Sequence, residues 1–82
     1  MATSERYYEY NKRIRQLREE HDLTQRFVAW ILNVVTRTYC DYESGRIRIP
    51  IDRLIILAEY YDVSMDYITG ITDVRGHFPK QK

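Results

Sequence analysis

The sequence predicts an all-α fold, a compact bundle of five helices, and three observations support this prediction. Strand signals are nearly absent, and apolar residues recur at helical spacing between short polar breaks. The 82 residues suffice for one hydrophobic core with little surplus stability. The apolar share of 44% and the charged share of 30% are typical of a folded chain. We therefore expect one domain over residues 1–70 and a short tail over residues 71–82 that frays.

The first helix is expected over residues 5–20. Tyr10, Ile14 and Leu17 follow the i, i+4, i+7 spacing that places side chains on one face of a helix. Arg6, Arg13 and Glu20 lie on other faces, so the helix is expected to be amphipathic and to bury its apolar face in the core.

The second and third helices are expected to be joined by a tight turn. A helix over residues 25–32 follows Thr24, whose hydroxyl can accept a hydrogen bond from a free N–H of the first turn. Asn33 comes next, and asparagine tolerates the left-handed conformation that a sharp turn needs. The third helix, over residues 36–43, ends near Gly45, because glycine is preferred just past a helix C-terminus.

The third helix is expected to have an apolar inner face and a polar outer face. Val35, Tyr39 and Tyr42 follow the i, i+4, i+7 spacing, so they should share the inner face. The outer face then carries Arg37, Asp41 and Ser44, with Thr36 and Cys40 beside them.

Two further helices complete the bundle. The fourth is expected to have Pro50 in its first turn, where the missing N–H of proline costs nothing, and to run to about Tyr61. Ser64 caps the fifth helix, and Gly70 ends it. Tyr39, Tyr42, Tyr61 and Tyr67 are all expected to face the core.

Charge gives only a weak indication of the partner. The net charge is +1, whereas DNA-binding domains often carry a pronounced basic excess. Residues 6–48 hold nine of the 13 Lys and Arg residues, whereas Arg53 is the one basic residue of the segment 50–70. The positive end of the chain is therefore its N-terminal part.

Catalytic and metal-binding patterns are absent from the sequence. Cys40 is the only cysteine, no residues near it have metal-ligand spacing, and His21 and His77 are isolated. No glycine-rich phosphate loop and no Ser/His/Asp or Cys/His set at usable spacing is present. We therefore expect no enzyme, no cofactor and no metal.

The sequence also has no pattern typical of a membrane-spanning segment or of a secretory signal. The longest uncharged stretch, between Arg26 and Arg37, is far shorter than the roughly 20 apolar residues that span a bilayer. The N-terminus has no apolar segment of the secretory type. We expect a cytoplasmic protein with no membrane partner.

Two short helices joined by a tight turn form the helix-turn-helix arrangement, and many residues match one family with this arrangement. Around the turn the match includes Leu23, Thr24, Gln25, Val28, Ala29, Leu32, Val34, Tyr39, Tyr42, Glu43 and Gly45. In the last two helices it includes Ile49, Pro50, Leu54, Leu57, Ala58, Tyr60, Tyr61, Val63, Ser64, Asp66, Tyr67 and Gly70. Over about residues 12–73 the chain resembles the lambda-repressor-like, Cro-type helix-turn-helix regulators of bacteria and phages.

This resemblance implies a sequence-specific regulator, a repressor, that binds double-stranded DNA as a homodimer and is associated with the nucleoid. It implies that the third helix reads bases in the major groove through Thr36, Arg37 and Asp41. It also implies a structural ion pair between Arg18 and Glu43. The phosphate-contacting or positioning residues that it implies are Gln25, Thr38, Ser44, Arg46 and Arg48.

The chain departs from the family pattern at the start and on the outer face of the third helix. Val35 stands where Ser or Thr is usual, which removes a side-chain cap worth about 1 kcal/mol. Asp41 places an acid near DNA phosphates, which is unfavourable unless it accepts a hydrogen bond from a cytosine amino group or pairs with Arg37 four residues earlier. Whether Asp41 reads a base stays open.

Phe27, Trp30 and Ile56 are apolar where the family is usually polar. Two interpretations remain open: an N-terminal segment with Tyr7, Tyr8 and Tyr10 folds over them, or a partner chain covers them. The second interpretation gives the rival function, a protein-interaction module such as an antitoxin-like partner or an adaptor.

Overall fold

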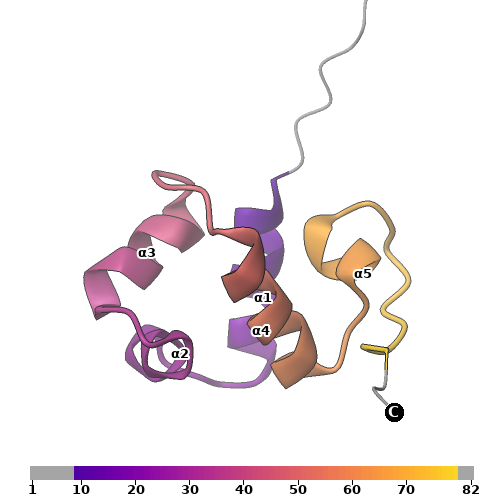
Figure 1. The fold of residues 1–82 in the computed structure, drawn as a ribbon, viewed down its shortest axis with the longest axis horizontal. Coiled ribbons are helices and arrows are strands. Elements are labelled where there is room, and N and C mark those ends of the chain that lie inside the picture. The colour runs from indigo at the N-terminus through magenta and orange to yellow at the C-terminus, as the bar shows by residue number, and fades with distance from the viewer. Residues whose placement is uncertain (1–8, 80–82) are drawn as a thin grey trace, which may run out of the picture.

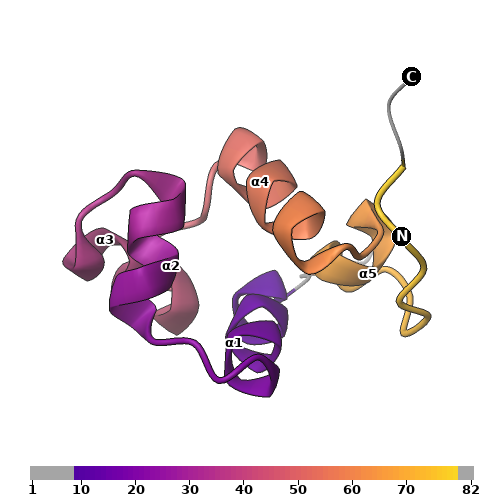
Figure 2. The ribbon, with the colours of Figure 1, turned by 90° about the horizontal axis from the view of Figure 1, so that it is seen from below.

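The computed structural model describes residues 9–79 and has five α-helices and no strand in that range (Figure 1), which confirms the all-α prediction. In chain order these are α1 (Tyr10–Glu20), α2 (Gln25–Leu32), α3 (Thr36–Ser44), α4 (Ile51–Tyr61) and α5 (Met65–Thr69). Figure 1 and Figure 2 show α2 and α3 together at one end of the molecule and α5 at the other. The helices α1 and α4 lie between these ends and connect them.

The helix ends form where the local sequence predicts them. Thr24 Oγ1 accepts from the backbone N–H of Phe27 at 3.0 Å, and Ser64 Oγ accepts from that of Tyr67 at 3.0 Å. These side chains satisfy donors that the first turn of a helix leaves free. Asn33 ends α2 with φ 59°, the left-handed conformation expected of it.

Two predicted helix starts are wrong. The first helix begins at Tyr10, because Glu9 has a non-helical backbone (φ −95°, ψ 63°); residues 5–8 lie outside the described residues. Tyr10 also packs against the core, and helices are stabilised mainly by such packing. Pro50 precedes α4 instead of lying in its first turn, since its ψ of 152° is extended.

The core is formed by residues from all five helices and the loops between them. Tyr39, Tyr42, Tyr61 and Tyr67 are buried, as predicted. Val35, which was expected on the same face as Tyr39, is instead 69% exposed. It is the residue before α3 and its backbone is extended (ψ 154°), so helical periodicity does not apply to it. The largest fully buried aliphatic side chains are Ile14, Leu17, Leu32, Leu54, Leu57 and Ile68.

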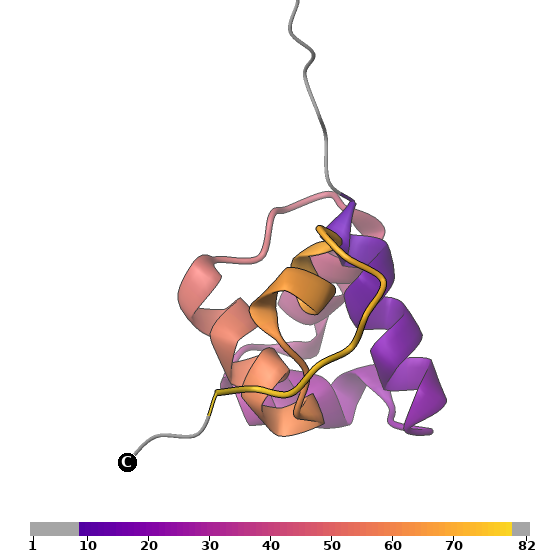
Figure 3. The same cartoon turned by 90° about the vertical axis from the view of Figure 1, so that its right-hand side faces the viewer.

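The segment 71–79 contacts the bundle at a few points, and the fraying expected of the tail stays a prediction. The backbone N–H of Ser64 donates to the carbonyl of Arg75 at 2.9 Å, and Nη2 of Arg75 lies 2.6 Å from Oε1 of Glu20. Phe78 packs against the core. Figure 3 shows the segment running from α5 past α1 and across the end of α4. Hydrogen bonds and one aromatic ring therefore hold a segment without regular structure; the domain limit at residue 70 stays a prediction.

No helix in the described part of the chain is both long enough and apolar enough to cross a membrane.

Candidate nucleic-acid interface

The candidate site is built on α2, the turn over residues 33–35, and α3. The buried side chains of Val28, Ala29 and Leu32 lie on the inner face of α2, which packs on α3. The backbone N–H of Val34 donates to the carbonyl of Ala29 at 3.0 Å and closes the turn. This arrangement is a helix-turn-helix, with the outer side of α3 turned away from the bundle (Figure 1).

The predicted base-reading residues lie in the first half and the middle of α3. Thr36 is exposed, and the side chain of Arg37 is 75% exposed. The side chain of Asp41 is 17% exposed, and its Oδ1 lies 3.5 Å from Nε of Arg37. Thr38 is half-buried. Of the two partners considered for Asp41, the arginine one turn earlier is therefore in place.

Glu43 is buried where α1, α2 and α3 meet, and four hydrogen bonds surround its carboxylate. Arg18 donates through Nε at 2.6 Å and through Nη2 at 3.1 Å, which is the ion pair implied by the resemblance. Gln25 donates through Nε2 at 3.1 Å, and the hydroxyl of Tyr39 also donates to Glu43. A buried carboxylate needs such partners, because leaving a buried charge unpaired is costly. We call Glu43 and these three donors the Glu43 cluster.

In and beside the Glu43 cluster, the pKa values of Arg18, Tyr39 and Tyr61 are raised above their ordinary values. The hydrogen bond from Arg18 to Glu43 raises the pKa of the guanidinium. Burial raises the pKa of the Tyr39 hydroxyl, and the hydrogen bond and charge of Glu43 raise it further. Burial also raises the pKa of Tyr61, with a second contribution from the charge of Glu43. The geometry therefore favours a charged arginine and protonated tyrosines.

The role of Tyr39 in this cluster was not predicted from the sequence, whereas the resemblance implied that Gln25 braces α3 besides contacting a phosphate. Tyr39 and Glu43 are spaced i, i+4, which was the available signal for their contact. Gln25, expected at a phosphate, uses its side chain inside the protein: besides donating to Glu43, its Oε1 lies 3.3 Å from the thiol of Cys40. Its side chain thus fixes the start of α2 to α3.

Three residues predicted to contact phosphate lie at the end of α3 and on the exposed loop that follows it. Ser44 Oγ lies 3.2 Å from the carbonyl of Asp41 and accepts from the backbone N–H of Arg46 at 3.3 Å. Arg46 and Arg48 are exposed. The guanidinium of Arg48 stacks over the ring of Tyr10, 4.5 Å from its centre. Ser44, Arg46 and Arg48 are therefore presented at the end of α3 and beyond it, as a phosphate-contacting loop requires.

The predicted partner surface is open in the described part of the chain. Trp30 is 75% exposed, Phe27 and Ile56 are 39% and 40% exposed, and the rings of Phe27 and Trp30 lie 5.9 Å apart. Tyr10 packs against the core and under Arg48, so it is not the cover considered for this surface. Tyr7 and Tyr8 lie outside the described residues. In residues 9–79 no group of three His, Cys, Asp or Glu side chains could hold a metal ion.

The helix pair, its exposed polar face and the basic loop define a helix-turn-helix unit. The sequence profile of the helix-turn-helix family matches residues 14–68, and the chain belongs to this family. Relatives in the family are named as transcriptional regulators and not as enzymes.

Two relatives and one solved structure show how far the similarity extends. The chain is 45% identical over 64 residues to the uncharacterized HTH-type transcriptional regulator YobD of Bacillus subtilis (strain 168), covering 78% of this chain and 57% of YobD. It is 31% identical over 58 residues to the HTH-type transcriptional regulator AnsR of the same organism, covering 71% of this chain and 50% of AnsR. A crystal structure of a transcriptional regulator from Listeria innocua matches with a TM-score of 0.75 and 30% identity, over 94% of this chain and 65% of that one. The chain thus spans about half the length of these two Bacillus relatives.

Proposed function

We propose that this protein is a sequence-specific, double-stranded DNA-binding transcriptional regulator, acting as a repressor, that places α3 in the major groove. The observation that carries the proposal is Arg37, a 75% exposed arginine on the outer side of the second helix of a helix-turn-helix. The Glu43 cluster supports it, because α3 is fixed to α1 and α2 through buried hydrogen bonds. The names of the relatives support the regulatory role.

Base reading is assigned to the first half of α3. The planar guanidinium of Arg37 can donate two hydrogen bonds to O6 and N7 of guanine, which discriminates against other bases by about 1–3 kcal/mol. In its ion pair with Asp41, Nε of the exposed Arg37 side chain lies 3.5 Å from Oδ1. An ion pair that includes an exposed side chain contributes little free energy. Arg37 can therefore exchange this contact for a base. Thr36 lies beside it at the start of the helix.

The loop after α3 is assigned to the DNA backbone. Contacts from Ser44, Arg46 and Arg48 to phosphates would set the register of the protein on the duplex without specifying its sequence. Thr38 and the N-terminus of α2 at Gln25 are assigned to the same task. With a net charge of +1, long-range attraction to DNA is small. We therefore propose a homodimer whose two α3 helices enter half-sites about 34 Å apart, acting in the cytoplasm at the nucleoid.

The test separates base reading from charge. Selection from a random duplex pool, followed by binding measurements at several salt concentrations, should give a palindromic site for the unaltered chain. Arg37→Lys keeps the charge but loses the planar fork, so it should lose preference for guanine by about tenfold while the salt dependence stays unchanged. Arg37→Ala should lose the preference for guanine and also reduce the salt dependence, because it removes one positive charge. The assignment of Arg37 is wrong if Arg37→Lys and the unaltered chain select the same site with equal affinity.

A second candidate function, a protein-interaction module, is favoured by the exposure of Trp30 beside Phe27. Large exposed aromatic side chains that adjoin each other are typical of interaction sites. In this case Trp30→Ala would abolish a stable complex with a protein partner, and no duplex would shift at any salt concentration. Tyr60→Ala is the matched control, because Tyr60 is also exposed but lies on α4.

A further inference from the structure

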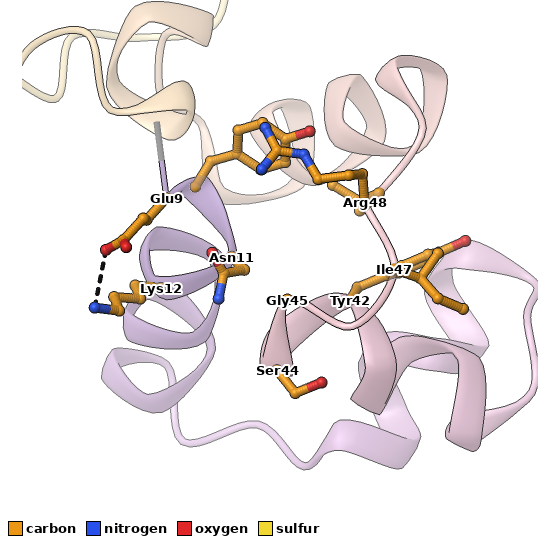
Figure 4. Close-up of a pocket in the computed structure, with 10 residues that line it drawn as sticks. Glu9, Asn11, Lys12, Tyr42, Ser44, Gly45, Ile47 and Arg48 are labelled. Carbon is orange, nitrogen blue, oxygen red and sulfur yellow. Dashed lines mark ion pairs between the residues drawn. The ribbon is translucent and has the colours of Figure 1, made fainter. Parts of the chain in front are cut away.

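A hollow of about 270 Å³ separates the N-terminal turn of α1 from the loop after α3 (Figure 4). Tyr10 and Asn11 line it from α1, and Ser44, Gly45 and Arg48 line it from the other side. Apart from Ser44 and Arg48, these residues have no part in the proposed function. The start of α1 therefore lies across this hollow from the loop assigned to the DNA backbone.

Asn11 fixes the start of this loop. Its Nδ2 donates to the backbone carbonyl of Glu43 at 3.1 Å. Gly45 follows with φ +82°, and a Cβ at this position would lie 3.1 Å from the same Nδ2. Glycine therefore both permits the left-handed backbone and leaves room for the asparagine. At the far end of the loop, Ile49 is buried in the core.

Tyr10 supports the side chain of Arg48 in the middle of the loop. The tyrosine ring packs against the core, so its position is set by the bundle. The guanidinium of Arg48 lies over this ring at 4.5 Å from the ring centre, within the range of a cation–π contact. A stacked guanidinium uses its flat face, whereas its N–H donors project from its edge toward acceptors such as phosphate oxygens.

We infer that Tyr10 is a positioning residue for DNA binding, which holds Arg48 in the orientation that meets a backbone phosphate. This inference rests on the proposed function. A free arginine side chain samples many rotamers, and holding it in one of them reduces the entropy that binding would otherwise cost. Tyr10 thus raises affinity for every DNA sequence without touching a base.

The experiment measures the affinity of the full chain for its selected duplex over a series of salt concentrations. Tyr10→Leu removes the ring and should weaken binding about threefold to fivefold, the size of a cation–π contact at an exposed site. Tyr10→Phe keeps the ring and should bind like the unaltered chain. Arg48→Gln should reduce the salt slope by about 0.9, the value for one phosphate contact. Tyr60→Leu is the matched control, since Tyr60 is a partly exposed tyrosine on α4, and it should leave binding unchanged.

The decisive variant combines Tyr10→Leu with Arg48→Gln. If Tyr10 acts through Arg48, Tyr10→Leu has no further effect once the arginine is gone. An equal loss of affinity in both backgrounds would show a purely structural role and overturn the inference. Should Tyr10→Leu not fold, Arg48→Lys tests the same contact: it keeps the charge and salt slope but should bind about threefold more weakly, because ammonium lacks the stacking face. Equal binding by Arg48→Lys would overturn the inference, whereas no duplex binding by the unaltered chain would overturn the proposed function itself.

Discussion

Helix α1 makes charged contacts with two parts of the molecule, and the two sets differ in burial. Toward α2 and α3, Arg18 meets Glu43 with side chains only 14% and 4% exposed. Toward the segment 71–79 at least one partner of each pair is open to solvent: Arg13 is 15% exposed but its partner Asp73 is 98% exposed, and Glu20 and Arg75 are both more than one third exposed. Ion pairs of similar length thus occur in two different environments.

The difference in burial decides what each contact does. Removing one partner of a buried ion pair leaves the other charge buried and unpaired, which lowers the free energy of unfolding by about 3–5 kcal/mol. An exposed ion pair contributes only about 0–1 kcal/mol to stability. The buried set therefore fixes the helix-turn-helix to α1. The exposed set holds the segment 71–79 through many weak contacts. A rigid α3 and a weakly attached tail are the expected result.

The largest expected effect comes from removing the cation of the buried set. Arg18→Met leaves the Glu43 carboxylate buried without its ion pair, so the free energy of unfolding should fall by about 3 kcal/mol. Urea denaturation measures this change. The double variant Arg18→Met/Glu43→Leu removes both charges and should recover most of the loss. A loss below about 1 kcal/mol for Arg18→Met would show that the buried set behaves like a surface pair.

The next effect is a loss of stability at alkaline pH. Tyr39 and Tyr61 have pKa values in the folded protein above their ordinary value near 10, chiefly because of burial. Both tyrosines are protonated in either state below pH 10, so stability is unaffected there. Above pH 10 the unfolded chain loses these protons first, and stability should fall by up to about 1.4 kcal/mol per pH unit for each tyrosine.

Tyr39→Phe isolates one of these two groups. Urea denaturation between pH 8 and about pH 11 should show a shallower alkaline decline for this variant than for the unaltered chain. At neutral pH it should lose about 1.5 kcal/mol, because Glu43 loses a hydrogen bond to a charged group. Tyr60→Phe provides the control, since Tyr60 is exposed. Identical pH profiles for Tyr39→Phe and the unaltered chain would contradict the pKa direction given for Tyr39.

Elements whose signals are local could be predicted from the sequence. Thr24, Asn33 and Ser64 determine helix ends through contacts within a few residues, and the structure has these ends where expected. Spacing also identified the buried tyrosines. The failures at Glu9 and Val35 both concern the residue just before a helix, where the backbone is not helical and helical spacing no longer applies.

Two of the contacts that the sequence did not reveal join residues far apart in the chain. Asn11 meets Glu43 and Arg75 meets Glu20, at separations of 32 and 55 residues. Such pairs depend on how helices pack, and no local pattern encodes them. For Gln25 the resemblance implied a brace on α3, but the partners of the side chain, Glu43 and Cys40, became known only from the structure.

The smallest expected effect lies in the exposed set. The hydrogen bond from Arg75, followed by that from Gln16, lowers the pKa of Glu20 below its ordinary value near 4.5. Its contribution is therefore present above about pH 4.5 and is lost as pH falls through the lower pKa of the folded state. Glu20→Gln should reduce the free energy of unfolding by less than about 0.5 kcal/mol at pH 7, since the pair is exposed.

Hydrogen exchange gives this small effect a local signature. The backbone N–H of Ser64 donates to the carbonyl of Arg75, so it reports whether the segment 71–79 stays docked. Glu20→Gln should speed the exchange of this amide and leave amides in α3 unchanged, because local opening need not involve the whole bundle. Glu59→Gln, which removes an exposed acid from α4, is the control. If Glu20→Gln also speeds exchange throughout α3, the tail contacts stabilise the helix-turn-helix, and the contrast between the two sets of contacts of α1 does not hold.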